Sequence, residues 1–458
     1  MLRSLAPVAR WFVGEGNVYF DITDVVGHAL KNKSVTGIQR VATSVLENII
    51  RFDEEGRYWG LVRDSFSGKF AAADLSFLRQ AHSYSDYAMR FEYAGSGDAW
   101  GHTLPPKYRP NPLSSLLRSM HRKLRWARSK RPQADLALEA RPPEPSSLAP
   151  LKLKKGDIVV TMGVGWSTKY REVHELAKRF ACKTVSVVYD LIPITHPQFA
   201  PGRSKRFCAW IDYIAANSDT ICTISEYSKG ELLSYLHGKG VHRQIHIIDL
   251  PHEFKNASGN SGAGIGEEIR RLAQERFMLC VGTVDHRKNA LGLLQAWHEL
   301  YKQGVRVPNA VICGAAGRGA GEIQNFLRSM ARDAGKAVTI IHNPSDAGLE
   351  LLYRSCQFSV FPSFVEGWGL PVGESLWFKK PVLCANCASM PEAGGKFAVY
   401  FDHGKPGSLR DALRQMIESP VELPDGIREQ LTTWEDTAAS VCAIVHSGHT
   451  AVACAQMS

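Results

Sequence analysis

The stretch VFPSFVEGWGLPVGESLWFKKPVLCAN, residues 360–386, places a glycine-rich loop and a short helical pattern between two apolar runs. The apolar runs within 356–363 and 381–386 predict buried strands, and residues 371–378 predict the helix between them. Because a helix that joins two neighbouring strands is typical of a parallel pair, this order indicates a βαβ unit. The stretch therefore predicts an α/β fold.

The same alternation of strand and helix runs through both halves of the chain. In the first half, NVYFDITDVV (residues 17–26) reads as a β-type run before a helix within 34–50, and apolar runs recur at 156–162, 182–194, 220–225 and 244–250. In the second half, strand patterns at 276–283, 309–314, 337–343, 356–363, 381–386 and 397–401 alternate with helical ones. Both halves are predicted to be doubly wound, Rossmann-like domains.

A change in composition marks the boundary between the two halves. Residues 255–268, KNASGNSGAGIGEE, are rich in Gly, Ser and Asn, as linkers are. A chain of 458 residues is also long enough for two domains. We predict a domain over 1–254, a linker over 255–268, a second domain over 269–432, and a final helix and tail over 433–458.

The positive charge of the chain is concentrated in one segment. Residues 99–134 hold nine Lys or Arg and no acid, which leaves only +1 of the net charge of +10 for the rest. A basic field over the whole protein, as in many nucleic-acid binders, is therefore excluded. We treat 99–150 as a basic, proline-containing insertion in the first domain.

Features of the N-terminus and of the cysteines favour a cytoplasmic protein. No run of 18 apolar residues is present, and the first residues lack the apolar core and cleavage site of a signal peptide. Several of the ten cysteines fall in or beside apolar strand patterns, where Cys acts as a small hydrophobic residue. The pair Cys384 and Cys387 forms one CxxC without further ligands, so a loop is favoured over a zinc or redox site.

The glycine-rich loop carries two carboxylates in positions suited to polyol binding. Glu366 follows the strand, and Glu374 lies one turn inside the next helix. Gly367 and Gly369 permit close approach of the backbone to a ligand. Carboxylates accept hydrogen bonds from pairs of hydroxyl groups, which suits sugar rings. The alternative is a solvated Glu366 and a Glu374 that favours the helix dipole.

A second motif adds two cations at the end of the first strand of the second domain. VGTVDHRKN, residues 281–289, brings Gly282 and Thr283 and then Arg287 and Lys288. Two cations at a strand end fit a diphosphate. Together with the two acids, they describe a crevice for a sugar, a diphosphate and a ribose.

These motifs resemble the retaining glycosyltransferases of family 4. The resemblance rests on VGTVDHRKN, on residues 360–386, on SMPEAGG (389–395), on TWEDTA (433–438), and, in the first half, on TGIQRV (36–41) and TISEYSKGEL (223–232). It implies the GT-B fold, in which two Rossmann-like domains face each other across a cleft and a final helix returns to the first domain.

The resemblance also implies a role for each matching residue. Glu366 would contact hydroxyls of the transferred sugar, Glu374 the ribose, and Arg287 with Lys288 the diphosphate. The backbone of Gly367, Trp368, Gly369 and Leu370, together with Gly282 and Thr283, would line the donor. Gly37 would approach the phosphate from the other domain, or else is a plain turn glycine. Asp190 would act at the reacting centre, beside Tyr189 where relatives often carry His.

The function implied is transfer of a sugar, with mannose on GDP favoured, from a nucleotide-diphosphate donor to a glycan or lipid-linked acceptor during polysaccharide synthesis. The anomeric configuration would be retained, and neither a metal nor another cofactor would be required. Two alternatives stay open: another nucleotide-sugar enzyme such as an epimerase, and a non-catalytic glycan-binding or assembly protein.

The basic segment suggests where the protein works. If residues 112–131 are helical, one face gathers Leu113, Leu116, Leu117, Met120 and Leu124, and the basic residues lie away from its centre. This pattern is typical of a helix that lies on an anionic membrane, although a solvated loop is the alternative. We expect a cytoplasmic protein, peripheral on the inner face of the membrane, without a nucleic-acid partner.

Overall fold

The computed structural model describes residues 16–29, 37–63, 68–79, 148–167, 169–255, 265–330, 334 and 337–447. The chain forms two compact units, each of which is described separately. Unit 1 comprises Met1–Val187, Trp210–Ile221 and Cys442–Ser458, and unit 2 comprises Val188–Ala209 and Cys222–Val441. The predicted basic segment 112–131 and most of the predicted linker 255–268 lie outside the described residues.

The first half of the chain supplies an eight-stranded sheet. Its order is β4 (Leu148–Ala149), β3 (Phe70–Ala73), β2 (Tyr58–Arg63), β1 (Val18–Asp21), β5 (Ile158–Thr161), β6 (Lys183–Val188), β7 (Thr220–Thr223) and β8 (Ile245–Ile247). Strand β1 pairs in parallel with β2 and β5, whereas β3 is antiparallel to both β2 and β4. The predicted strands at 156–162, 182–194, 220–225 and 244–250 are confirmed in shorter form.

The helices of this half are α1 (Thr23–Ala29), α2 (Gly37–Phe52), α5 (Tyr170–Arg179), α6 (Ile192–Thr195), α7 (Ser204–Asn217) and α8 (Glu226–His237). The prediction of an extended run over 17–26 is wrong beyond Asp21. The Asp21 carboxylate accepts a hydrogen bond from the Thr23 N–H at 3.0 Å, and Val26 N–H bonds back to Ile22 O. These bonds end the strand and begin α1, because a side-chain acceptor offers the backbone an alternative to the sheet.

The second half supplies a six-stranded sheet in which the order of the strands along the chain reverses at the centre. Its order is β11 (Val338–Ile341), β10 (Asn309–Cys313), β9 (Phe277–Val281), β12 (Phe358–Phe361), β13 (Val382–Ala385) and β14 (Val399–Phe401). All pairs of neighbours are parallel. Chain order proceeds outward from β9 on one side and from β12 on the other. Ligands of open α/β sheets bind at such a switch point, beyond the carboxyl ends of the strands.

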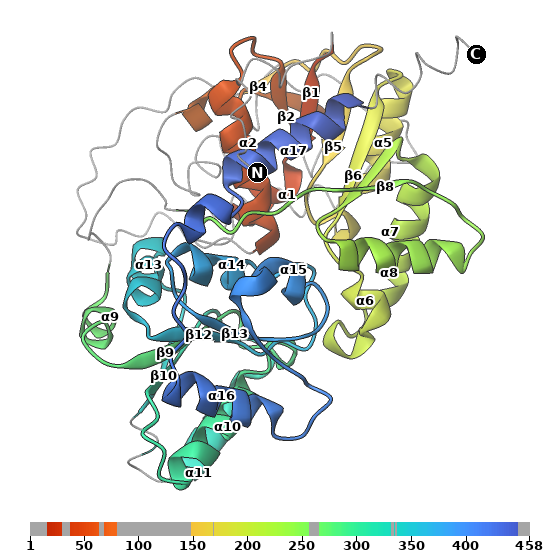
Figure 1. Ribbon diagram of the computed structural model, residues 1–458. Helices are drawn as coiled ribbons and strands as arrows, with labels where there is room; N and C mark the ends of the chain where they lie inside the picture. The colour runs from red at the N-terminus through yellow and green to blue at the C-terminus, as the bar shows by residue number, and fades with distance from the viewer. Residues whose placement is uncertain are drawn as a thin grey trace, which may run out of the picture. The chain divides into compact units, whose positions relative to one another are not determined.

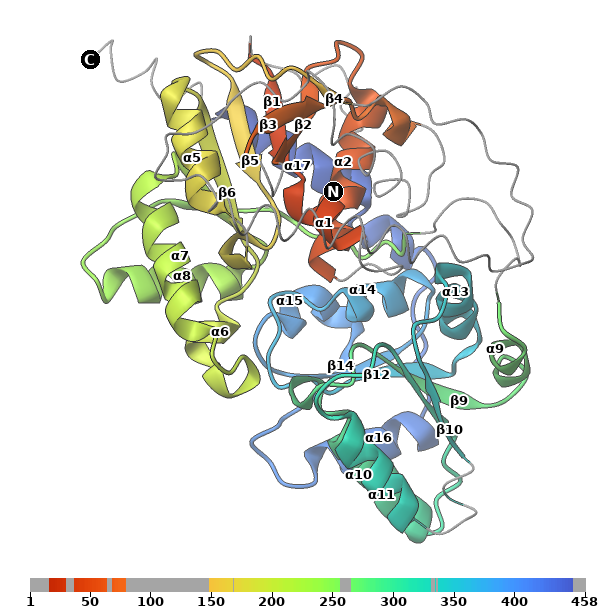
Figure 2. The ribbon, with the colours of Figure 1, turned by 180° about the vertical axis from the view of Figure 1, so that it is seen from behind.

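Helices cover both faces of this sheet (Figures 1 and 2), with α10 (Ala290–Lys302), α11 (Ala320–Ser329) and α16 (Ser408–Glu418) on one face and α13 (Asp346–Ser355) and α14 (Leu370–Trp377) on the other. The described residues of this half also form the short helices α9 (Glu267–Leu272) and α15 (Met390–Gly394). Successive side chains of strand β9 point to opposite faces of the sheet and pack against the helices there. Met278 packs in the cluster of Trp297 from α10, and Phe277 packs in that of Tyr353 from α13. Doubly wound architecture is thus confirmed.

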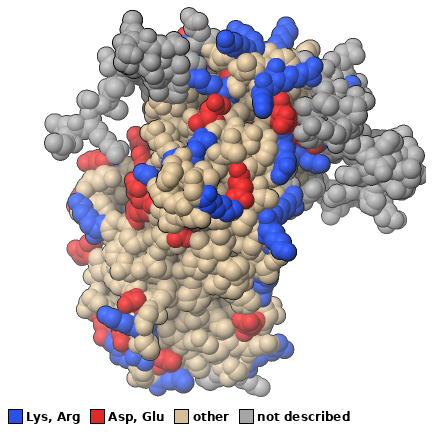
Figure 3. All heavy atoms as spheres, turned by 90° about the vertical axis from the view of Figure 1, so that its right-hand side faces the viewer, with Lys and Arg blue, Asp and Glu red and all other residues tan. Residues whose placement is uncertain are grey.

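The last helix, α17 (Trp434–Ser447), has residues in both units. Its residues from Cys442 onward belong to unit 1, where the Tyr58 hydroxyl lies 2.9 Å from His446 Nε2. The sequence predicted such a final helix. Among the helices of the described ranges, none is long and apolar enough to span a membrane. On the face drawn in Figure 3, basic and acidic side chains are interspersed.

Candidate functional site

Two segments at the carboxyl ends of β9 and β12 form the site in unit 2. After β9, Gly282 has a φ of +150°, and a Cβ there would lie 3.2 Å from Lys288 Cε. Glycine thus leaves room for the lysine side chain. The Asp285 carboxylate accepts a hydrogen bond from the Arg287 N–H at 3.3 Å and begins a 3₁₀ turn over His286–Lys288. This turn presents both predicted cations at the strand end.

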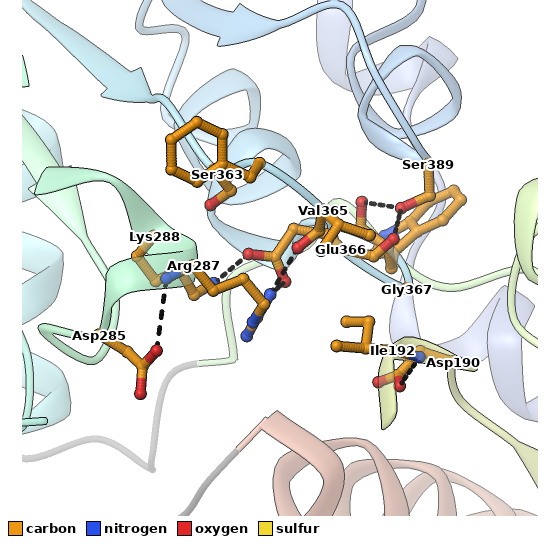
Figure 4. A network of polar contacts seen from close by, with 12 residues as sticks. Asp190, Ile192, Asp285, Arg287, Lys288, Ser363, Val365, Glu366, Gly367 and Ser389 are labelled. Atoms are coloured by element: carbon orange, nitrogen blue, oxygen red, sulfur yellow. Dashed lines mark hydrogen bonds and ion pairs between the residues drawn. The ribbon is translucent and has the colours of Figure 1, made fainter. Parts of the chain in front are cut away.

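The loop after β12 is held by serine side chains (Figure 4). Ser389 Oγ lies 2.9 Å from the carbonyl oxygen of Glu366 and 2.8 Å from that of Trp368. Ser225 Oγ donates to the carbonyl oxygen of Gly367 at 2.8 Å. Three successive carbonyl groups are therefore fixed by side chains from outside the loop, which gives the loop a defined shape.

A cluster of three charges joins the two segments (Figure 4). The Glu366 carboxylate lies 2.5 Å from Arg287 Nη1 and 2.7 Å from Lys288 Nζ. Arg287 Nη1 also donates to the Val365 carbonyl at 2.7 Å, and Phe364 N–H donates to the Arg287 carbonyl at 2.9 Å. Glu366 is only 8% exposed, which excludes the alternative of a solvated loop residue. We call Glu366, Arg287 and Lys288 the charge cluster.

Burial and pairing set the protonation of the charge cluster. Burial would raise the pKa of Glu366, but the charges and hydrogen bonds of Arg287 and Lys288 lower it to about 2. Burial lowers the pKa of Lys288, although Glu366 opposes this effect. Glu366 is consequently a carboxylate at neutral pH. With both cations charged, the cluster carries a net positive charge, which favours an anionic ligand.

Asp190 lies against the same loop. A Cβ at Gly367 would lie 2.3 Å from the Tyr189 carbonyl oxygen and 3.1 Å from Asp190 Cβ, so only glycine fits there. Asp190 Oδ1 accepts a hydrogen bond from the Ile192 N–H at 3.0 Å. Burial raises the pKa of Asp190, against the opposing effects of that hydrogen bond and of the Arg287 charge. Two predicted residues distant in sequence, Asp190 and Glu366, are thus neighbours in the site.

For the other predicted site residues, which lie outside the charge cluster, the structure gives a position. Glu374 is 4% exposed within α14 and accepts a hydrogen bond from the Tyr353 hydroxyl at 2.8 Å. Gly369, with a φ of +122°, precedes α14, which begins at Leu370. Thr283 is exposed. Gly37 is the first residue of α2 and belongs to unit 1. The ribose role of Glu374 and the phosphate role of Gly37 stay predictions.

Sequence reasoning missed the residues that support the loop. Ser225 and Ser389 fall inside the motifs TISEYSKGEL and SMPEAGG, so their positions could be noticed, but not their contacts. Glu392, in the second motif, accepts hydrogen bonds from the N–H groups of Glu226 and Tyr227 at 2.6 and 2.8 Å, at the start of α8. In the described part of the chain, no group of His, Cys, Asp and Glu is arranged to hold a metal ion.

Comparison with known proteins finds a family domain in the part of the chain that holds the charge cluster. Residues 267–434 match the model of the family described as glycosyl transferases group 1. The chain carries a glycosyltransferase group 1 domain. All three residues of the charge cluster lie within this domain.

Curated relatives of the chain include O-antigen mannosyltransferases. The O-antigen chain mannosyltransferase B of Escherichia coli is 25% identical over 238 residues, which cover 52% of this chain and 61% of that protein. The serotype-specific mannosyltransferase WbdA of Escherichia coli is 24% identical over 251 residues, or 53% of this chain and 30% of that protein. The matched region thus spans less than two thirds of either relative.

Solved structures resemble the chain over nearly its whole length. The structure of HepE from Anabaena in complex with UDP has a TM-score of 0.52 at 12% identity and covers 96% of this chain and 99% of that one. Sucrose-phosphate synthase from Thermosynechococcus elongatus has a TM-score of 0.51 at 14% identity, with coverage of 97% and 98%. At this level of identity the likeness shows the fold alone, and that fold is GT-B.

Proposed function

We propose that the chain is a retaining glycosyltransferase that moves a sugar from a nucleotide-diphosphate donor to a glycan or lipid-linked saccharide in polysaccharide biosynthesis. The observation that carries the proposal is the charge cluster at the switch point of a glycosyltransferase group 1 domain. The O-antigen mannosyltransferases among its relatives favour mannose as the transferred sugar.

The proposed chemistry follows from where charge develops. Breaking the bond between the anomeric carbon and the phosphate builds negative charge on the leaving diphosphate and positive charge on the sugar ring. Arg287 and Lys288 would stabilise the diphosphate, helped by the N-terminal N–H groups of α14. Glu366, ionised at neutral pH, would accept hydrogen bonds from the sugar hydroxyls and face the positive charge of the ring.

Asp190 has a role different from that of the charge cluster. Its Cβ would lie 3.1 Å from a Cβ at Gly367, and burial favours the protonated form of its carboxyl group. We propose that it contacts the sugar close to the reacting carbon, which leaves the acceptor hydroxyl to approach from the face that the diphosphate leaves. Replacement of Asp190 by Asn should therefore reduce the turnover number more than the affinity for a nucleoside diphosphate.

We further propose that transfer needs no metal ion, because Arg287 and Lys288 supply the positive charge that the diphosphate requires. Transfer by protein treated with EDTA should then match that of untreated protein. We also propose that the enzyme works at the inner face of the membrane, where lipid-linked saccharides are accessible.

An assay of the product tests the proposed activity. Purified protein is incubated with GDP-mannose, UDP-glucose and other nucleotide sugars, each with a short mannose-containing acceptor, and the product is examined by NMR. We expect one donor to be consumed, with the α-configuration of its anomeric carbon preserved in the product. A product of inverted configuration would contradict the retaining mechanism, and hydrolysis or epimerisation without transfer would contradict the proposed function.

A further inference from the structure

Ser363 carries a buried hydroxyl group that the protein leaves without a partner. The residue follows Pro362 at the end of β12 and is 0% exposed. Within the described ranges, Ser363 Oγ has no hydrogen-bond partner. Buried hydroxyl groups are normally hydrogen-bonded, because an unpaired one costs free energy. This exception requires an explanation.

The neighbouring serines are satisfied, whereas Trp368 Nε1 of the same loop is, within the described ranges, also buried without a hydrogen-bond partner. On strand β12, which precedes Ser363, Ser359 Oγ donates to Ser375 Oγ at 2.7 Å. Ser389 and Ser225 donate to the carbonyl groups of the loop. The backbone of Ser363 is also held, since its carbonyl oxygen lies 3.0 Å from His403 Nε2. The backbone of Ser363 is therefore fixed, while its hydroxyl group has no partner within the described ranges.

The side chain of Ser363 is oriented toward the charge cluster. In Figure 4 its side chain is directed toward the side chains of Lys288 and Glu366. Next to Ser363, Phe364 N–H donates to the Arg287 carbonyl, so the loop and the turn that carries both cations are joined at this point. A donor group is thus directed toward a positively charged cluster, which is an arrangement suited to an anionic oxygen.

We propose that the Ser363 hydroxyl donates a hydrogen bond to an oxygen of the donor's diphosphate, next to Lys288. This inference rests on the proposed function. Phosphate oxygens accept hydrogen bonds and cannot donate them, so they match a group whose proton has no acceptor in the protein. Because the hydroxyl gains a partner only when the diphosphate binds, its hydrogen bond adds to affinity rather than to folding stability.

Three proteins test this assignment: the wild type, Ser363→Ala and the control Ser359→Ala. Each is titrated by calorimetry with GDP, with UDP and with the matching nucleosides, and each is melted without ligand. Ser363→Ala should bind the preferred nucleoside diphosphate about tenfold more weakly, bind the nucleoside unchanged, and melt no lower than the wild type. Ser359→Ala, which loses a hydrogen bond inside the protein, should melt lower and keep the wild-type affinity.

Each contrary result has a distinct meaning. Equal affinity of the wild type and Ser363→Ala for the nucleoside diphosphate would overturn the role of Ser363 and leave the proposed function standing. An equal loss of affinity for the nucleoside and for the nucleoside diphosphate would overturn the assignment to the diphosphate. A lower melting temperature of Ser363→Ala would show that the hydroxyl serves the fold instead. A wild type that binds no nucleotide would overturn this inference and the proposed function together.

Discussion

Glu366 and its two cations depend on one another for their charged forms. Burial alone would raise the pKa of Glu366 and lower that of Lys288, whereas their mutual attraction opposes both shifts. Removing one partner of a buried ion pair leaves an uncompensated charge in a poorly solvated place. A ligand diphosphate would bring further negative charge to the same cations.

Replacement of Glu366 by Gln should abolish transfer and destabilise the protein. We expect the free energy of unfolding to fall by about 3 kcal/mol or more, because two partly buried cations lose their partner. Urea denaturation measures this change. The control is Glu350→Gln, which breaks the Glu350–Arg354 pair on α13 and should cost at most about 0.5 kcal/mol. Equal costs for the two variants would contradict the importance of the charge cluster.

The stability difference between wild type and Glu366→Gln should depend on pH. The pKa of Glu366 is lowered from 4.5 to about 2 in the folded protein, so its charged form adds stability above pH 4.5. That contribution is lost as the pH falls toward 2, where the wild-type carboxyl group becomes neutral like the amide. Unfolding of both proteins across this range should show the difference shrinking. A difference independent of pH would mean that the carboxylate is not stabilised by its neighbours.

At the scale of elements, the loop between β12 and α14 is the part whose shape matters most. Gly369, with a φ of +122°, turns the chain into α14, and Gly367 lies too close to the Tyr189 carbonyl for any side chain. The first N–H groups of α14 receive no side-chain cap within the described residues. The loop thus combines a fixed backbone with a helix start suited to an anion.

Replacement of Gly369 by Ala should therefore weaken donor binding as well as stability. An alanine at this φ would be strained, at a cost of about 1 to 2 kcal/mol, or would move the start of α14. The control is Gly321→Ala in α11, where a Cβ meets nothing within 4 Å and Ala favours the helix. Melting curves and titrations with a nucleoside diphosphate measure both effects. A Gly369→Ala protein with wild-type affinity would contradict the importance of the loop shape.

The elements themselves could largely be predicted, because strands and helices depend on local patterns. The helix predicted over 371–378 is α14, and the strands on either side of it are β12 and β13. The prediction of a strand over 23–26 failed because one hydrogen bond to Asp21 outweighed the β-type composition. The contacts of Glu366, Ser389 and Ser363 could not be predicted, since they join segments distant in the sequence.

At the scale of the whole molecule, the proposed donor site lies in one compact unit of a longer chain. The glycosyltransferase group 1 domain covers residues 267–434, whereas the first half of the chain forms an eight-stranded sheet of its own. The basic segment 112–131, outside the described residues, is the predicted membrane contact.

Removing positive charge from this segment should weaken membrane binding. We expect a variant with Arg118, Arg122 and Arg125 replaced by Ala to bind vesicles of phosphatidylglycerol and phosphatidylcholine more weakly, by about 1 kcal/mol per arginine. Both the wild type and this variant should bind vesicles of phosphatidylcholine alone more weakly than the wild type binds the mixed vesicles. Co-sedimentation with each kind of vesicle measures the binding. A variant with Arg270, Arg271 and Arg276 replaced by Ala is the control for total charge. Equal binding of all three proteins would contradict the predicted membrane contact.

The central claim, that this chain binds a nucleotide-diphosphate sugar through its charge cluster, is tested most directly by thermal-shift titration of the wild type and Lys288→Ala. A ligand that binds only the folded state raises the melting midpoint. We predict a rise that is selective for one base, increases with one particular sugar, and is much smaller in Lys288→Ala. No rise with any nucleotide in cooperatively melting protein, or equal rises in both proteins, would contradict the claim.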